Sequence, residues 1–369
     1  MSKCLVTGAG GFLGKHLLLW LEQARYNVMA YHHADGEQAL KRCCMECDVV
    51  FHLAGVNRPK LAEEFETGNA GFTELLVNAL EQAGNACPII FASSIQAKSD
   101  NPYGRSKQRA ENILLKHGNA TGADVKIYRL PNVFGKWCRP NYNSVVATFC
   151  YNQTNGLPLV IHDASRLMEL VHVDDVMTSF LETLKASEKE EGVYQEVPVT
   201  YRKTVGEVAT IIQDFGVCRQ SLHMPDQEDG FLRKLYSTYL SYLPLEGLSY
   251  PLCMHEDARG SFTEFMRTEG QGQFSVNISH PHIVKGNHWH HTKHEKFLVV
   301  SGEGVIRLRK LGAEDVTSYW VSGRKLEVIE IPPGCTHNIE NIGEQDMVTL
   351  MWANEPFEPE QPDTWPMEV

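Results

Sequence analysis

Near its start the chain carries Lys3-Cys4-Leu5-Val6-Thr7-Gly8-Ala9-Gly10-Gly11-Phe12-Leu13-Gly14, the stretch that decides the fold of its first part. The apolar residues before the glycines predict a short buried strand, and a helix is expected from Lys15 to about Gln23. A strand, a glycine turn and a helix in this order are the context of a dinucleotide fingerprint. The glycines let a backbone approach a pyrophosphate, whose charge then faces the amides at the helix start. The sequence therefore predicts an α/β domain.

The second expected strand, 26–31, ends at His32-His33. Proteins that prefer NAD usually carry an acidic residue there, which binds the ribose hydroxyls. The acid is absent here, and five basic residues could attract a 2′-phosphate, namely Lys15, His32, His33, Lys41 and Arg42. These observations favour NADPH, although the two histidines are equally well explained as a plain polar loop.

A tyrosine and a lysine four residues apart are the strongest chemical signal in this half. Tyr103-Gly104-Arg105-Ser106-Lys107 opens an expected helix, so that the phenol and the ammonium share one face. A neighbouring ammonium favours the phenolate, and the pair can then exchange a proton with a carbonyl or alcohol oxygen. The pair alone is common by chance, but here it follows the strand 88–94, which ends in Ser93-Ser94.

Several segments in order resemble the extended short-chain dehydrogenase/reductase family. They are the glycine turn, Phe51-His52-Leu53-Ala54-Gly55, Asn69-Ala70-Gly71, the Tyr103/Lys107 pair, Arg129-Leu130-Pro131-Asn132-Val133-Phe134-Gly135 and His172-Val173-Asp174-Asp175-Val176. The family commonly acts on nucleotide sugars. One departure is visible: only about fifteen residues separate His33 from the strand 48–53, which leaves room for one short helix and suggests a trimmed sheet.

The resemblance implies a role for each matching residue. Tyr103 would be the acid/base, Lys107 would hold the cofactor ribose and lower the tyrosine pKa, and Ser94 would orient the substrate oxygen, with Ser93 as the competing candidate. Asn132 and the run 139–143 would lie by the sugar nucleotide, unless that run is a surface loop. The expected cofactor contacts are Gly8, Gly11, Phe12, Leu13, Gly14, His32, Leu53, Ala54, Gly55 and Lys107.

The length and the net charge limit the classes of protein to which the chain can belong. A chain of 369 residues predicts two domains. A net charge of −12 argues against a general nucleic-acid binder and against a polybasic membrane protein. No secretory signal and no apolar run of membrane-spanning length is visible. Ten cysteines without a disulfide rhythm suit a reducing compartment, so we expect a cytoplasmic protein.

The character of the chain changes between residues 236 and 260. This stretch is rich in Tyr and Pro and poor in helical rhythm, and we place a linker at about 243–252. Beyond it, short strands with tight turns predict an all-β barrel or jelly roll. The expected strands are 262–266, 272–279, 296–301, 304–310, 317–321, 326–331 and 347–352. The predicted domains are therefore 1–245, which is α/β, and 252–369, which is all-β.

The second domain contains His288-Trp289-His290-His291-Thr292-Lys293-His294-Glu295. Imidazole and carboxylate are ligands of Zn²⁺ and similar divalent ions. A second block, 332–341, supplies His337 after a Pro-Pro-Gly turn. The two blocks resemble the two cupin motifs, except that Leu326 stands where a glycine is usual. The resemblance implies a metal held by His288, His290, Glu295 and His337, with His294 as a substitute and His280, His282 and His291 at the rim.

A reductase followed by a metal cupin resembles the CapF-type bifunctional enzymes of capsular polysaccharide synthesis. That family implies a UDP-4-keto-6-deoxy-N-acetylhexosamine substrate, C3 epimerisation by the cupin and C4 reduction with NADPH. The product would be UDP-2-acetamido-2,6-dideoxy-L-talose, on the route to UDP-N-acetyl-L-fucosamine. A homodimer is expected by analogy. In one alternative the metal cupin only supports folding or dimerisation. In another the chain is a sensor of NADPH and a sugar nucleotide, which the intact Tyr103/Lys107 pair disfavours.

Overall fold

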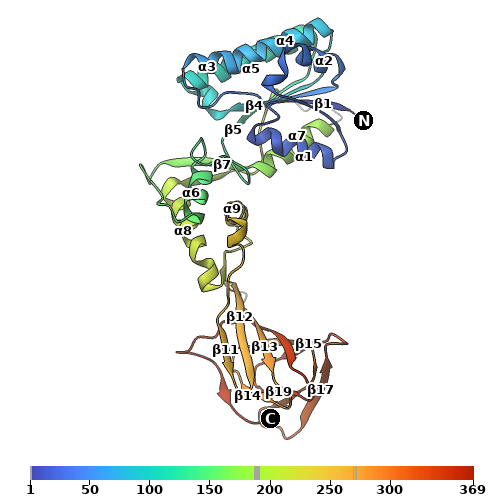
Figure 1. Ribbon diagram of the computed structural model, residues 1–369, viewed down its shortest axis with the longest axis vertical. Coiled ribbons are helices and arrows are strands. Elements are labelled where there is room, and N and C mark those ends of the chain that lie inside the picture. The colour runs from blue at the N-terminus through green and yellow to red at the C-terminus, as the bar shows by residue number, and fades with distance from the viewer. Residues whose placement is uncertain (1, 187–191, 269, 271) are drawn as a thin grey trace. The chain divides into compact units, whose positions relative to one another are not determined.

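The computed structural model describes residues 2–186, 192–268, 270 and 272–369. The chain divides into two compact units (Figure 1). The first comprises residues 1–213 and 234–243, and the second comprises 214–233 and 244–369. The second unit thus takes in residues 214–233, a segment that the expected boundary assigned to the first domain.

A six-stranded parallel sheet forms the centre of the first unit, in the order β2-β1-β3-β4-β5-β8. Its strands are β1 (Lys3–Thr7), β2 (Asn27–Tyr31), β3 (Val49–His52), β4 (Ile89–Ser94), β5 (Val125–Leu130) and β8 (Tyr194–Gln195). The expected trimming is confirmed, because the single helix α2 (Gly36–Glu46) fills the interval between β2 and β3. The four inner strands β1, β3, β4 and β5 are buried on both faces, as is usual for a parallel sheet covered by helices.

Helices cover both faces of this sheet (Figure 1). One apolar cluster joins the sheet to α1 (Phe12–Gln23) and α7 (Val173–Lys185). The other joins it to α2, α4 (Phe72–Ala83) and α5 (Pro102–Thr121). The turns that follow β1, β3 and β4 therefore meet at the carboxyl edge of the sheet, where ligands bind in such folds.

A smaller three-stranded sheet completes the first unit, with the order β6-β7-β9. It is formed by β6 (Asn132–Phe134), β7 (Leu167–His172) and β9 (Tyr201–Thr204). The remaining helices are the short α3 (Glu63–Phe65), the π-helix Glu66–Gly71, α6 (Val145–Thr154), α8 (Val205–Ser221) and α9 (Gly230–Leu240). Little helical structure was expected from residue 236 onward, and this expectation is wrong for 236–240. Phe231, Leu235 and Tyr239 are buried at four-residue spacing, so one face of α9 packs inward.

The second unit contains two sheets, as predicted for an all-β jelly roll. The larger has the order β10-β12-β13-β20-β15-β18 with β11 beside β12, and the smaller has the order β17-β16-β19-β14-β21. The strands are β10 (His223–Met224), β11 (Met254–Asp257), β12 (Gly260–Thr268), β13 (Gly272–Ser279), β14 (Val284–Trp289), β15 (Glu295–Ser301), β16 (Glu303–Lys310), β17 (Val316–Ser322), β18 (Val328–Ile331), β19 (Cys335–Asn341), β20 (Met347–Ala353) and β21 (Trp365–Pro366). One apolar core draws on both sheets, including Phe297 and Ile339.

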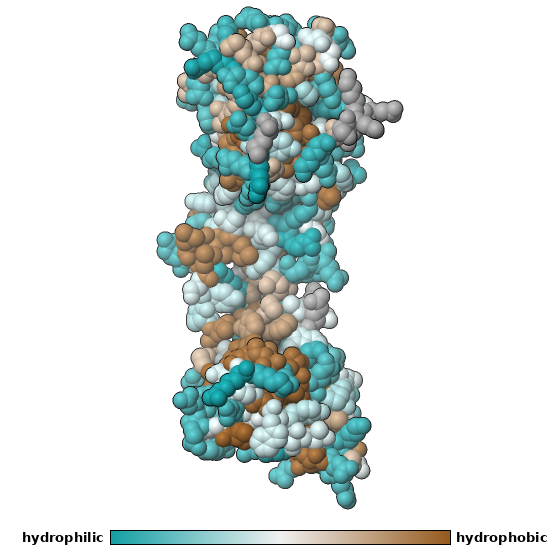
Figure 2. Space-filling model, turned by 90° about the vertical axis from the view of Figure 1, so that its right-hand side faces the viewer, coloured by the Kyte–Doolittle hydropathy of each residue, from teal (hydrophilic) through white to brown (hydrophobic). Residues whose placement is uncertain are grey.

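Surface hydropathy is mixed in both units. On the face that Figure 2 presents, hydrophobic residues lie among hydrophilic ones. Within the described residues, no helix is both long enough and apolar enough to cross a membrane.

Candidate active sites

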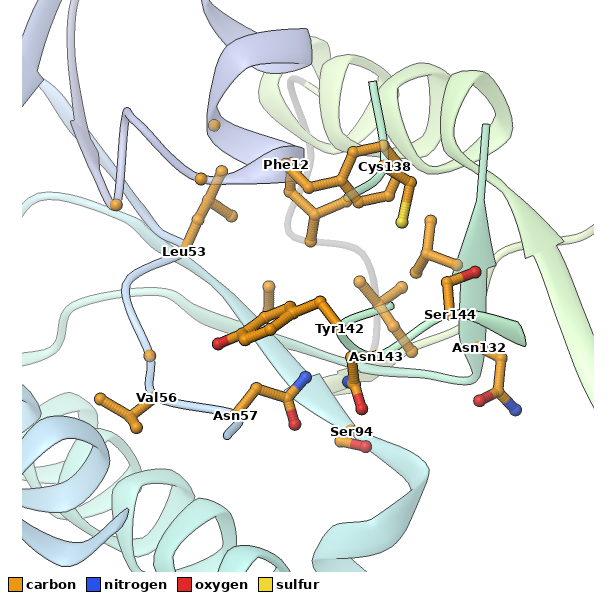
Figure 3. Close-up of a pocket in the computed structure, with 18 of the residues that line it drawn as sticks. Phe12, Leu53, Val56, Asn57, Ser94, Asn132, Cys138, Tyr142, Asn143 and Ser144 are labelled. Carbon is orange, nitrogen blue, oxygen red and sulfur yellow. The ribbon is translucent and has the colours of Figure 1, made fainter. Parts of the chain in front are cut away.

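A cavity of about 530 Å³ opens at the carboxyl edge of the parallel sheet. The glycine turn, the loop after β3, the end of β4 and the segment 130–144 line it (Figure 3). Of the predicted site residues, the lining includes Gly8, Gly11, Phe12, Leu13, Gly14, Leu53, Gly55, Ser94, Tyr103 and Lys107. His32 and Ala54 are outside that lining. His32 lies beside the turn, because a methyl group on Gly10 would be 3.4 Å from its Nδ1 atom.

The glycine turn is held tightly against the backbone around it. Gly8 has a φ of +70°, and a Cβ there would lie 2.6 Å from the amide nitrogen of Ala54. A Cβ on Gly14 would lie 2.2 Å from the carbonyl oxygen of Gly8. Only glycine fits these positions. The close packing brings the start of α1 up to the cavity, where its free amides can face a phosphate.

Tyr103 and Lys107 stand on α5 as the four-residue spacing predicts. Asn101 caps this helix, its Oδ1 atom accepting the Gly104 amide at 2.8 Å. The ammonium of Lys107 is buried and donates to the carbonyl oxygen of Ala92 at 2.8 Å. Burial lowers the pKa of Lys107 to about 8, against an opposing contribution from the Glu111 carboxylate. The cavity therefore holds a cation whose charge is sensitive to pH in the mildly alkaline range.

The side chain of Ser94 lies beside the phenol of Tyr103 in the lining of the cavity. Burial raises the pKa of Tyr103, and the neighbouring Ser94 side chain opposes that rise. This direction is opposite to the one expected from the Tyr103/Lys107 pair, because burial outweighs the other contributions. A raised pKa keeps the phenol protonated near neutrality, as a proton donor must be.

The neighbouring Ser93 has a different environment from Ser94. Its hydroxyl is buried and donates to Glu111 at 2.5 Å. Glu111, which is only 1% exposed, also accepts two hydrogen bonds from Arg129, at 3.0 and 2.6 Å. The geometry thus distinguishes the two serines: Ser94 faces Tyr103, and Ser93 belongs to a buried carboxylate network. Glu111 was not among the predicted site residues, although its place four residues after Lys107 puts it on the same helical face.

A second buried network ties the glycine turn to α5. His52 Nδ1 lies 2.8 Å from the Thr7 hydroxyl and His52 Nε2 lies 2.9 Å from the Thr73 hydroxyl. The Thr73 hydroxyl donates to the carbonyl oxygen of Asn69, whose side chain donates to Ser106. Burial lowers the pKa of His52 to about 3, so the ring is neutral and links Thr7 at the end of β1 to Thr73 on α4.

A different group of residues converges inside the second unit. One candidate ligand atom from each of His288, His290, Glu295 and His337 lies within 4.8 Å of the other three. His288 and His337 are register partners across β14 and β19, and Glu295 begins β15. The strands β14, β15 and β19 thereby bring together three of the four residues predicted as ligands, and His290 follows directly after β14. His294 stands apart, with its ring against Trp352.

The charges in this cluster suit a divalent cation. Burial and the nearby His337 lower the pKa of His288 to about 4, which keeps this ring neutral. Burial alone would raise the pKa of Glu295, but His290 and His337 outweigh it and the carboxyl is ionised. The buried Nε2 atom of His337 makes no hydrogen bond, although Glu295 Oε2 lies 3.2 Å away. Three imidazoles, one of which has an unsatisfied nitrogen, and one carboxylate fit Zn²⁺ or a similar ion.

The two units together define a class of protein: a short-chain dehydrogenase/reductase joined to a β-barrel that carries a histidine-rich cluster able to hold a metal ion. Two family models match the chain. Residues 4–195 match the NAD dependent epimerase/dehydratase family, and residues 255–365 match the polysaccharide biosynthesis C-terminal domain. A nicotinamide dinucleotide is therefore the cofactor of the first unit.

Individual relatives agree with these matches over the whole chain. A UDP-2-acetamido-2,6-β-L-arabino-hexul-4-ose reductase from Pseudomonas aeruginosa is 43% identical over 368 residues, covering 100% of this chain and 99% of the relative. The crystal structure of the capsular polysaccharide assembling protein CapF from Staphylococcus aureus has a TM-score of 0.93 and 46% identity, covering 99% of this chain and all of CapF. The chain belongs to the NAD dependent epimerase/dehydratase family and, within it, to the CapF type.

More distant structures share only the fold of the first unit. A UDP-glucose 4-epimerase from Thermus thermophilus, solved with NAD, has a TM-score of 0.54 and 19% identity over 67% of this chain.

Proposed function

We propose that the chain is a bifunctional nucleotide-sugar enzyme of capsular polysaccharide synthesis. The second unit epimerises C3 of a UDP-4-keto-6-deoxy-N-acetylhexosamine, and the first reduces the C4 ketone with NADPH. The product is UDP-2-acetamido-2,6-dideoxy-L-talose, on the route to UDP-N-acetyl-L-fucosamine. The observation that carries the proposal is the placement of Ser94, Tyr103 and Lys107 in one cavity, in a chain 43% identical to a hexul-4-ose reductase.

The reduction needs a proton at the ketone oxygen as hydride reaches C4, and NADPH supplies that hydride when bound. Tyr103 is the proton donor, because its raised pKa keeps the phenol protonated. Ser94, which lines the same cavity, orients the same oxygen. Lys107 is held in place by its hydrogen bond to the carbonyl oxygen of Ala92. Its positive charge would attract the ribose hydroxyls of the cofactor and stabilise the tyrosinate that remains after proton transfer.

The choice of NADPH rests on the end of β2. The strand is followed by His32 and His33 rather than by an acid, and both side chains are exposed beside the start of α2. Lys41 and Arg42 are exposed further along that helix. The Asp35 carboxylate accepts the amide of His32 at 2.7 Å, so the proposal rests on the basic side chains, which would attract a 2′-phosphate.

The epimerisation rests on the cluster in the barrel. A hydrogen on C3 is acidic because it lies next to the C4 ketone, and a divalent ion held by the cluster, here proposed as Zn²⁺, supplies Lewis acidity. His288, His290, Glu295 and His337 are the residues that would hold the ion. His290 and His337 are buried and His288 and Glu295 are partly buried, and this partial removal from water strengthens electrostatic interactions within the site.

We also propose that the enzyme is a homodimer. The edge strand β17 exposes Tyr319 and Trp320, the latter at 70%, and such edges favour pairing with another chain. Light scattering on the full-length protein tests this, and a monomeric mass contradicts it.

Two measurements on the full-length protein test the division of labour. In D₂O without NADPH, the metal-loaded enzyme is expected to incorporate deuterium at C3 of the 4-keto substrate, followed by NMR. Tyr103→Phe is expected to lose NADPH oxidation by at least about 100-fold, the scale of general acid catalysis, while C3 exchange persists. The reciprocal variant His337→Ala should lose exchange and retain NADPH binding.

Each expected result has an outcome that would contradict it. Absence of deuterium uptake by folded, metal-loaded wild-type protein means that the barrel serves folding or dimerisation instead. Loss of both exchange and NADPH oxidation in Tyr103→Phe means that the two activities do not reside in separate sites.

A further inference from the structure

The segment 362–367 lies against the backbone around all three histidines of the metal cluster. Its strand β21 pairs with β14, so that Pro366 is opposite His288 and Trp365 is opposite Trp289. The Met367 amide donates to the carbonyl oxygen of Asn287 at 2.9 Å. The Met367 carbonyl oxygen accepts the hydroxyl of Thr336, the residue before His337, at 2.5 Å. The segment therefore touches each strand that delivers a histidine.

Asp363 makes the densest set of contacts in this segment. Its Oδ1 atom accepts the amide of His291 at 2.9 Å. Its Oδ2 atom accepts the amides of Thr292 and Lys293 at 2.9 and 3.0 Å, and the Thr292 hydroxyl at 3.2 Å. One carboxylate thus holds three consecutive amides of the loop that separates two predicted ligands, His290 and Glu295.

The main chain of Asp363 contacts a ligand directly. Its carbonyl oxygen lies 2.5 Å from Nδ1 of His290. A carbonyl can only accept, so Nδ1 carries the hydrogen and Nε2 is the atom turned toward Glu295, 3.3 Å away. A hydrogen bond of this kind fixes the tautomer and ring orientation of a metal-binding histidine.

The backbone of Asp363 adopts a conformation that non-glycine residues seldom adopt. Its φ is +39°. Such a conformation costs about 1–3 kcal/mol and persists where the surroundings hold it in place. At Asp363 it lets the carboxylate reach the loop amides while the carbonyl of the same residue reaches His290. The contacts of the carboxylate and of the carbonyl together hold Asp363 in this conformation.

We propose that Asp363 is a positioning residue of the metal site, and that it acts on the ion through the loop 290–295 and the His290 ring. The proposal rests on the proposed function in one respect, the binding of a divalent ion by the four-residue cluster. It adds a residue 68 positions beyond Glu295 in the sequence, which the histidine blocks do not contain.

A purely structural role is the competing explanation. The segment covers the edge of β14, and such cover protects a sheet whatever the barrel binds. The two roles differ in what they change: edge protection affects the stability of the metal-free barrel, whereas positioning affects the affinity of the assembled site for the metal.

The test is a Zn²⁺ competition titration of the full-length protein against a chromophoric chelator, with the melting temperature of each metal-free variant recorded. Asp363→Ala and Asp363→Gly are expected to bind Zn²⁺ roughly 10- to 100-fold more weakly, as for other partners of metal ligands. The glycine variant relieves the positive φ, so a loss there is due to the missing carboxylate. Asp363→Asn, which keeps one acceptor oxygen, should lie between these variants and the wild type.

Asp346→Ala is the matched control, because this carboxylate pairs with the exposed His280 at 2.8 Å in the same unit. It should bind Zn²⁺ as the wild type does. Wild-type affinity in all three Asp363 variants overturns the proposal, even if their metal-free proteins melt earlier. His337→Ala separates this failure from a failure of the metal site itself: if His337→Ala also binds Zn²⁺ normally, the four-residue cluster is not the site.

Discussion

At the scale of single residues, burial decides the chemistry of the reductase site. Tyr103 and Lys107 are both enclosed, and desolvation moves both toward their neutral forms: the pKa of the phenol rises and that of the ammonium falls to about 8. Glu111 counteracts the fall, because its buried charge favours the protonated lysine. The protonation states of the proposed acid, Tyr103, and of Lys107 therefore depend on their surroundings, namely on burial for both and on Glu111 for the lysine.

This balance predicts how the rate depends on pH. The kcat/KM for ketone reduction should fall above about pH 8, where Lys107 loses its proton. Glu111→Gln removes a charge that raises the pKa of Lys107, so the fall should begin at lower pH. A pH profile of NADPH oxidation measures the shift, and Glu66→Gln is the control, since it removes only an exposed pair with Arg109. An unchanged profile in Glu111→Gln would show that the carboxylate does not set the charge of Lys107.

At the scale of elements, close backbone packing rather than side chains shapes the cofactor end of the first unit. In the turn between β1 and α1, a Cβ on Gly14 would meet the carbonyl oxygen of Gly8, and a Cβ on Gly8 would meet the amide of Ala54. Neither Gly8 nor Gly14 therefore has room for a Cβ. Gly10, in the same turn, meets only His32 at 3.4 Å. The three glycines are thus not equivalent.

Two substitutions in the turn test this difference between the glycines. Gly14→Ala should destabilise the protein by about 1–3 kcal/mol, since the methyl group meets backbone that must shift. Gly10→Ala should leave the melting temperature close to that of the wild type, because its methyl group makes an ordinary contact. Thermal unfolding without cofactor measures both. Equal destabilisation by the two substitutions would contradict the packing argument.

At the scale of the whole molecule, the chain consists of two units with separate cores and separate sites. An ion that binds only the folded barrel stabilises that unit by mass action, by about 4 kcal/mol at a thousand times its Kd. The parallel sheet of the first unit receives no such contribution.

Removal of the metal should therefore act on one unit alone. Calorimetry of the full-length protein with and without a chelator is expected to show one transition moved to lower temperature, and a second transition, stabilised by NADPH, unmoved. The apo enzyme should keep its NADPH affinity and lose C3 exchange. A chelator that shifts neither transition would show that the cluster holds no metal, and one that lowers both would show that the units do not unfold independently.

The sequence by itself determined the fold class of each unit and the residues of both sites that lie in local patterns. A glycine turn between strand and helix, a tyrosine and lysine one helical turn apart, and two histidine blocks are short-range signals, since each depends on the geometry of a few consecutive residues. Strands such as β13, β15, β16 and β20 followed from the same periodicities, whereas β14 and β19, which carry His288 and His337, were not among the strands expected. The part of α9 from residue 236 was missed because polar and tyrosine residues stand between its buried positions.

Only the tertiary structure decided which residues act from a distance. Ser94 is distinguished from Ser93 by which way each side chain faces at the end of β4, where one meets Tyr103 and the other Glu111. Asp363 reaches the metal cluster because β21 pairs with β14, across more than seventy residues of sequence. The direction of the Tyr103 pKa shift likewise depends on enclosure by segments far apart in the chain. Burial and long-range pairing are properties of the folded chain, so no local pattern encodes them.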